Sequence, residues 1–138
     1  MTEQTFDVSD VEVLGGVVAY LQVVGAVKAS DFYVQAFGAR EVARHPVDDQ
    51  GRTMHIHLHV NSGSLMLSDS YPEHGVPAEV PGGFTLHLKV TDIEKHWKRA
   101  VAAGCDVLLP LQDMFWGDRY GQLRDPFGVR WSMGEPKN

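Results

Sequence analysis

Apolar and polar residues alternate along the chain in a pattern that divides it into two similar halves. In the first half, alternation predicts a strand near 17–24, and apolar residues three and four positions apart predict a helix near 26–37. Three further alternating segments follow near 40–45, 53–60 and 64–69, separated by turn-forming residues. The first half therefore reads as strand, helix and three strands.

The second half repeats this order of elements. It begins with a strand from about residue 84, continues with a helix that ends at Gly104, and finishes with strands near 106–109, 119–124 and 129–134. Thr91 and Glu94 in the segment TDIE have the spacing of a capping box, which predicts the helix start. A connector rich in proline and glycine, YPEHGVPAEVPGG, lies between the halves at 71–83.

A weak internal repeat supports the division. At an offset of 67 residues, Leu21 falls on Leu88, and at an offset of 65, Leu58 falls on Leu123. Few residues are identical, but the order of elements agrees at both ends of each half. The sequence therefore predicts two βαβββ modules.

Each predicted sheet has a single helix, which can cover only one of its faces. The apolar members of each alternation should face the helix, so the opposite face of each sheet is polar. Two such faces that curve toward each other would enclose a polar cleft, whereas plain exposure to solvent would explain the same pattern. The polar set comprises Tyr20, Gln22, His55, His57, His59, Thr85, His87, Lys89, Tyr120, Gln122, Arg124, Arg130 and Ser132.

The segment MHIHLHV places His55, His57 and His59 at every second position, on one face of a strand. Neighbouring imidazoles in such a row could hold zinc or nickel, with help from His87 of the other half. The alternative is that they line a pocket as hydrogen-bonding groups. No carboxylate accompanies them at a comparable spacing, which favours the second interpretation.

Composition narrows the function further. The chain has 138 residues, a formal net charge of −6 and no basic run, which argues against a nucleic-acid partner. The chain has a single cysteine, Cys105, which is typical of a protein from a reducing compartment. We expect Cys105 to be a small buried residue. The first residues lack the features of a secretory signal, and no apolar run approaches the roughly 20 residues of a membrane span. We therefore expect a cytoplasmic protein with no membrane partner.

The segments ASDFYVQAFGA (29–39), MHIHL (54–58), LMLSD (65–69) and FWGDRYGQLRDPFGVRW (115–131) resemble the vicinal oxygen chelate superfamily. This superfamily includes glyoxalase I, bleomycin-resistance proteins and extradiol dioxygenases, and the chain is most similar to its PhnB-like branch. The resemblance implies an α+β fold in which two βαβββ modules, related by pseudo-twofold symmetry, form a cup-shaped, partly open sheet. It also implies a homodimer. The expected boundaries are an N-terminal arm at 1–16 and modules at 17–70 and 84–134, with 17–134 forming a single glyoxalase-like domain.

The resemblance also implies places for a metal. The ligand positions of metal-dependent members fall on Val18, Leu67, Thr85 and Ser132, and none of these is a good ligand for a divalent metal. We therefore predict no metal and no other cofactor. A relocated divalent metal at the histidine row is the alternative.

Three other features have two interpretations each. Phe115 and Trp116 could close over a ligand or fill the edge of the core. Arg124 could contact an anion or stabilise the following turn through Asp125. Asp69 could act as a general base or cap a strand end. With Asp69, the candidate catalytic residues are His57 and His87, and whether the protein is an enzyme is left open.

Two functions follow from these observations. The first is a protein of the glyoxalase/bleomycin-resistance type that binds a polar or anionic, partly planar small molecule without a metal, using the polar set and Trp116. The alternative is a lyase, isomerase or dioxygenase-like enzyme that uses a relocated metal or His/Asp acid–base chemistry. Because imidazoles gain charge on acidification, anion binding should tighten from about pH 8 to about pH 6.

Overall fold

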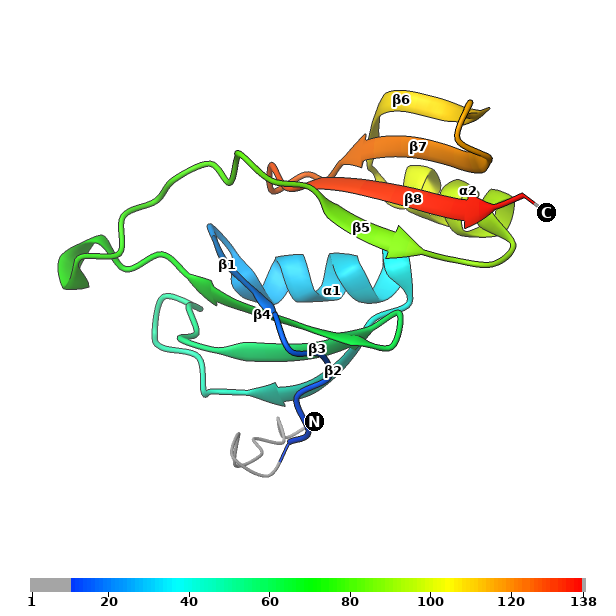
Figure 1. The fold of residues 1–138 in the computed structure, drawn as a ribbon. Helices are drawn as coiled ribbons and strands as arrows, with labels where there is room; N and C mark the ends of the chain where they lie inside the picture. The colour runs from blue at the N-terminus through cyan, green and yellow to red at the C-terminus, as the bar shows by residue number, and fades with distance from the viewer. Residues whose placement is uncertain (1–10, 138) are drawn as a thin grey trace. The chain divides into compact units, whose positions relative to one another are not determined.

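The computed structural model describes residues 11–137. These residues form two compact units (Figure 1). The first unit contains residues 11–34 and 38–79, and the second contains 35–37 and 80–137. The boundary between residues 79 and 80 lies inside the connector that the sequence predicts.

The first unit is a four-stranded mixed sheet with one helix. Its elements are β1 (Ala19–Val23), α1 (Ala26–Phe37, of which residues 35–37 belong to the second unit), β2 (Arg40–Arg44), β3 (Ile56–Val60) and β4 (Gly63–Asp69). The strand order is β1-β4-β3-β2, in which β1 and β4 are parallel and the other neighbours are antiparallel.

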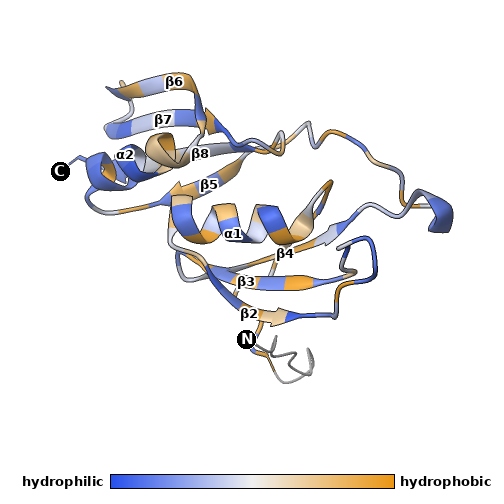
Figure 2. Cartoon of the chain, turned by 180° about the vertical axis from the view of Figure 1, so that it is seen from behind, coloured by the Kyte–Doolittle hydropathy of each residue, from blue (hydrophilic) through white to orange (hydrophobic). Residues whose placement is uncertain are grey.

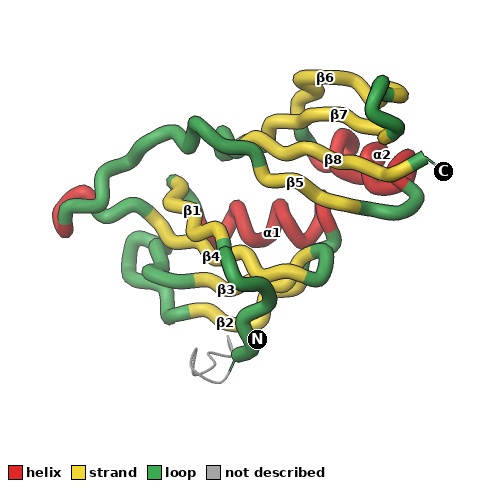
Figure 3. The backbone as a smooth tube through the Cα atoms, viewed as in Figure 1, coloured by secondary structure: helices red, strands yellow, loops and turns green. Residues whose placement is uncertain are grey.

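The second unit has the same architecture. Its elements are β5 (Leu86–Lys89), α2 (Ile93–Ala103), β6 (Asp106–Asp113), β7 (Asp118–Arg124) and β8 (Arg130–Pro136), with strand order β5-β8-β7-β6. The segment between β4 and β5 is mostly loop and contains one short 3₁₀ helix, η2 (Pro72–His74) (Figure 3). The prediction of two βαβββ modules is therefore confirmed.

Strand register refines the internal repeat. In the parallel pairs, Leu21 lies opposite Leu67, and Leu88 lies opposite Met133. The last strands of the two units thus correspond at an offset of 66 residues, while β3 and β7 correspond at the expected 65. The turn between β3 and β4 is shorter than the loop between β7 and β8, which accounts for the difference.

The cores follow the predicted alternation. The hydropathy of β3 alternates along the strand (Figure 2), and its apolar residues Ile56 and Leu58 are fully buried. Burying such side chains contributes roughly 1.5–3 kcal/mol each. Six more of the residues that were expected to face the helices are buried: Leu21, Val23, Leu88, Val90, Trp131 and Met133.

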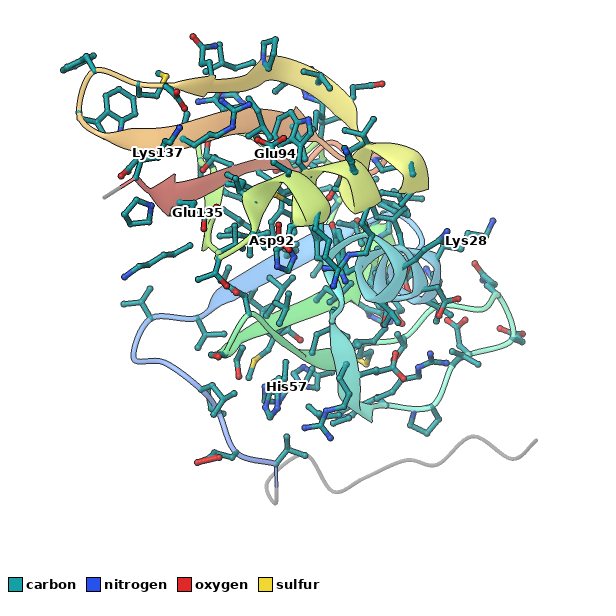
Figure 4. All side chains as sticks on the ribbon, turned by 90° about the vertical axis from the view of Figure 1, so that its right-hand side faces the viewer. Lys28, His57, Asp92, Glu94, Glu135 and Lys137 are labelled. Atoms are coloured by element: carbon teal, nitrogen blue, oxygen red, sulfur yellow. The ribbon has the colours of Figure 1, made fainter. Side chains whose placement is uncertain are left out.

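The first amides of each helix are capped by a carboxylate from β4 or β8, the last strand in sequence of the same unit. The Asp69 carboxylate accepts hydrogen bonds from the backbone amides of Gly25 and Ala26 at 2.9 Å. Glu135 accepts in the same way from the amides of Asp92 and Ile93, at 3.0 and 2.9 Å. Figure 4 shows Asp92 and Glu135 at the start of α2.

The capping box predicted from TDIE is wrong. Asp92, rather than Thr91, is the N-cap residue of α2, and its side chain makes no capping hydrogen bond. Its backbone is left-handed, with φ of 59°, and its amide points to Glu135. The Glu135 carboxylate, which is distant in the sequence, therefore accepts hydrogen bonds from the first amides of α2 in place of a local capping box.

The expected strand at 106–109 is also too short. In the structure β6 continues through Pro110 to Asp113, and its pairing with β7 is irregular on both sides of Leu109. Because β6 is an edge strand, the proline nitrogen need not donate to a neighbour.

Candidate functional site

The three alternating histidines of the first unit lie in a row and are already hydrogen-bonded. His55 Nδ1 lies 2.7 Å from the Tyr20 hydroxyl, and His57 Nε2 lies 2.7 Å from the hydroxyl of Ser64. The His57 and His59 rings are 5.1 Å apart between centroids. His57 is only 1% exposed, so it is a buried group rather than an open surface ligand.

A segment near the N-terminus lies along this histidine row. The Ser64 hydroxyl accepts a hydrogen bond from the Leu14 amide, and the Ser64 amide donates to the Leu14 carbonyl. His59 Nε2 lies 2.9 Å from the carbonyl oxygen of Glu12. These contacts could not be predicted from local patterns, because they join residues about 50 positions apart.

The environment of the row changes its titration. Burial lowers the pKa of His55, and the neighbouring His45 lowers it further. Burial likewise lowers the pKa of His57, with added repulsion from His59 and His55. These two imidazoles therefore gain charge at a lower pH than an ordinary histidine, so they contribute less to tighter anion binding between pH 8 and pH 6 than unshifted imidazoles would.

The metal places implied by the resemblance do not fit a divalent metal. Because the last strands correspond at an offset of 66, the counterpart of Ser132 is Met66 and not Leu67, which is fully buried in the core. Neither a thioether nor a neutral hydroxyl is a strong ligand for zinc or nickel. Within residues 11–137, no group of three or more His, Cys, Asp or Glu side chains is placed to hold a metal ion.

The second unit carries an aromatic group on its polar face. The rings of His87 and Tyr120 are stacked, with centroids 6.1 Å apart and planes at 22°, and Trp116 meets Tyr120 edge-on at 5.7 Å. Gly134 makes room for this arrangement, since a Cβ atom there would lie 2.9 Å from His87 Cε1. His87 Nδ1 also lies 2.7 Å from the Ser132 hydroxyl, which orients the imidazole.

Other predicted residues of this face lie beside the aromatic group. Gln122 donates a hydrogen bond to the Tyr120 hydroxyl and is the register partner of Ser132. Phe115 is 96% exposed, so it does not fill the edge of the core, whereas Trp116 is 49% exposed and packs against Tyr120. The exposed members of the predicted set are Tyr20, Gln22, Thr85, His87, Lys89, Trp116, Arg124 and Arg130.

Arg124 does not stabilise the turn through Asp125. The Asp125 carboxylate accepts from the amides of Phe127 and Val129 and from the indole nitrogen of Trp131. Arg124 instead lies opposite Arg130 in the β7–β8 pair, and both line a hollow of about 220 Å³.

Asp69 is a structural carboxylate. It is 4% exposed, and besides capping α1 it accepts a hydrogen bond from the buried amide of Thr53 at 2.8 Å. Its role is therefore structural, and the group that it caps is helix α1 rather than the predicted strand end. Cys105 is buried, and burial raises the pKa of its thiol to about 12, so it is no nucleophile at neutral pH.

A larger hollow in the first unit lies away from the histidine row. It has a volume of about 720 Å³ and is lined by residues that include Val24, Lys28, Val47, Asp69 and Ser70. The buried hydroxyl of Ser70 has no hydrogen-bond partner among the residues described. Apart from Asp69, the sequence pointed to none of these residues, because they come from loops and strand ends.

These two modules are those of a known superfamily. The sequence matches the Glyoxalase/Bleomycin resistance protein/Dioxygenase superfamily over residues 16–133, and the chain belongs to this superfamily. An uncharacterized protein of Mycobacterium tuberculosis is 41% identical over 140 residues, covering 97% of this chain and 82% of that protein.

Solved structures agree with this assignment. TioX from Micromonospora sp. ML1 is 29% identical with a TM-score of 0.71, covering 88% of this chain and 98% of that one. A Pseudomonas aeruginosa protein is 31% identical with a TM-score of 0.73, at the same coverage. The PhnB protein from Bacillus cereus shares the fold at 22% identity, with a TM-score of 0.69 and coverage of 88% and 99%.

Neither helix of residues 11–137 is long and apolar enough to span a membrane.

Proposed function

We propose that the protein binds a polar or anionic, partly planar small molecule on the polar face of its second sheet, without the family's usual metal. The observation that carries the proposal is the aromatic group of the second unit. His87, Tyr120 and Trp116 offer flat surface beside hydrogen-bonding groups, on the face of the sheet away from α2. Such a combination of apolar rings with a few oriented polar groups is typical of small-molecule sites.

The same observations argue for binding rather than for catalysis with a relocated metal. His57 Nε2 is held by Ser64, and Asp69 is occupied by three backbone amides. Of the three candidate catalytic residues, only the exposed His87 is open to a ligand. A metal or an acid–base pair would need groups that these contacts already use.

The experiment uses naphthalene-2-carboxylate as a planar anionic probe. We expect its addition to the ¹⁵N-labelled full chain to shift amide resonances of β5, β7 and β8. Gly134→Ala should weaken binding, because the added methyl group displaces His87. Gly16→Ala, at a glycine of the first unit with open space around it, is the matched control.

The result that would overturn the proposal is equally specific. Shifts confined to residues around the larger hollow of the first unit, or equal affinity of wild type and Gly134→Ala, would remove the aromatic group from the site. The homodimer and the cytoplasmic location remain predictions. A sedimentation measurement that finds only a 15.3 kDa species at micromolar concentration would exclude the dimer.

A further inference from the structure

Two arginines of the second unit lie opposite each other, and neither forms an ion pair with a residue from 11 to 137. Asp106 is the register partner of Arg124 in the β6–β7 pair, but the two side chains are not paired. Arg124 and Arg130 are directly opposite in the antiparallel β7–β8 pair, on the polar face of the sheet. Their Cα atoms are thus about 4.5–5.5 Å apart. Both side chains are exposed, and neither guanidinium makes a hydrogen bond or an ion pair with any residue from 11 to 137. Like charges in this position repel each other.

The arginines line a hollow that the connector helps to form. It has a volume of about 220 Å³ and is completed by residues 80–84 and Gly128. Gly128 has a positive φ of 92°, and a Cβ atom there would lie 3.0 Å from Val80 Cγ1. The glycine therefore lets the connector lie close to the β7–β8 loop. A hollow of this size is below the roughly 300–1,000 Å³ of a site for a whole drug-sized ligand.

From this geometry we infer that Arg124 and Arg130 form a clamp for the acid group, a carboxylate or a phosphate, of the molecule bound on the polar face. Guanidinium groups bind such oxyanions through paired hydrogen bonds, and an anion between them relieves their repulsion. The inference rests on the proposed function and names where the acid group of the ligand binds.

The clamp is within reach of the aromatic group. Ser132, which is hydrogen-bonded to His87, lies two residues beyond Arg130 on the same face of β8. That separation is about 7 Å along the strand. A planar ring beside His87 can therefore carry a carboxylate or phosphate that reaches the arginines.

The test compares two probes that share a ring system. We expect naphthalene-2-carboxylate to bind the wild-type chain about tenfold more tightly than the neutral naphthalene-2-carboxamide, because hydrogen bonds to charged groups are the stronger ones. In the variant that combines Arg124→Gln and Arg130→Gln, the two probes should bind equally. Arg119→Gln is the matched control, since this arginine of β7 is already paired with Glu94 and Asp113. It should keep the tenfold preference.

A second measurement tests the clamp without a ring. Inorganic phosphate should raise the melting temperature of the wild type above that in sodium chloride of equal ionic strength, and it should not do so for the double variant. A phosphate effect with no preference for the carboxylate would assign the arginines to free oxyanions and overturn the clamp.

The remaining outcomes separate the two proposals. If both probes bind the polar face equally in the wild type, and the double variant changes neither, the clamp is wrong while the proposed function stands. If neither probe binds the wild type, the proposed function fails and the clamp fails with it.

Discussion

Replacing Asp69 with alanine should strongly destabilise the first unit. The carboxylate accepts hydrogen bonds from the amides of Gly25, Ala26 and Thr53, and both Asp69 and Thr53 are buried. Loss of the helix cap costs about 1 kcal/mol. A buried amide left without an acceptor costs about 1–3 kcal/mol more. The free energy of unfolding should therefore fall by about 3 kcal/mol.

Urea denaturation followed by circular dichroism measures this loss, and the melting temperature should fall by about 10 °C. Asp69→Asn keeps one acceptor oxygen and should lose less than Asp69→Ala. Asp31→Ala, at an exposed position of α1, is the control and should have little effect. A loss below about 1 kcal/mol for Asp69→Ala would show that its amides find other acceptors, and the capping argument would be wrong.

Three further predictions concern stability. Gly121→Ala should lower the free energy of unfolding by about 1–3 kcal/mol, because its Cβ would lie 2.6 Å from the Trp97 ring. Combining it with Trp97→Leu, which has a smaller side chain, should restore part of this loss in urea titrations. Ser70→Ala should leave the midpoint of urea unfolding unchanged or raise it, since the buried hydroxyl has no partner among the described residues. Hydrogen bonds from the amides of Ile93 and Asp92 lower the pKa of Glu135, so its contribution to stability is present above about pH 4.5 and is lost as the pH falls further. Thermal scans from pH 6 to pH 3 should find a shallower decline for Glu135→Gln than for the wild type.

The order of elements and their inward faces could be predicted because both depend on local patterns. Period-two alternation and helical spacing are visible within windows of ten or so residues, and they placed β3, α1 and β7 within a few positions. Pro110 interrupted that pattern, so the second part of β6 was missed. An edge strand tolerates a proline that a local rule interprets as a strand end.

The contacts that decide what the polar residues do could not be predicted in the same way. Asp69 and Glu135 reach helix amides more than 40 positions away, and Ser64 meets Leu14 across 50 positions. The sequence correctly placed His57 on the polar face but did not reveal that it is buried. Strand register depends on loop length, and between equivalent register pairs the β3–β4 turn is one residue shorter than the β7–β8 loop. The sequence alignment therefore placed one implied metal ligand at Leu67 instead of Met66.

The segment that contains Glu12 and Leu14 also affects how the protein behaves during purification. Its main chain is hydrogen-bonded to His59, the last imidazole of the row, and to Ser64, which contacts His57. Proteolysis that removes the residues before Gly15 would free His59 from the Glu12 carbonyl and would free the Ser64 hydroxyl, which contacts His57, from the Leu14 amide. The His55 and His57 rings are 6.5 Å apart between centroids and the His57 and His59 rings 5.1 Å, separations that suit shared coordination of an immobilised metal ion. Clipped and intact chains would then elute separately from a nickel resin, even without an affinity tag.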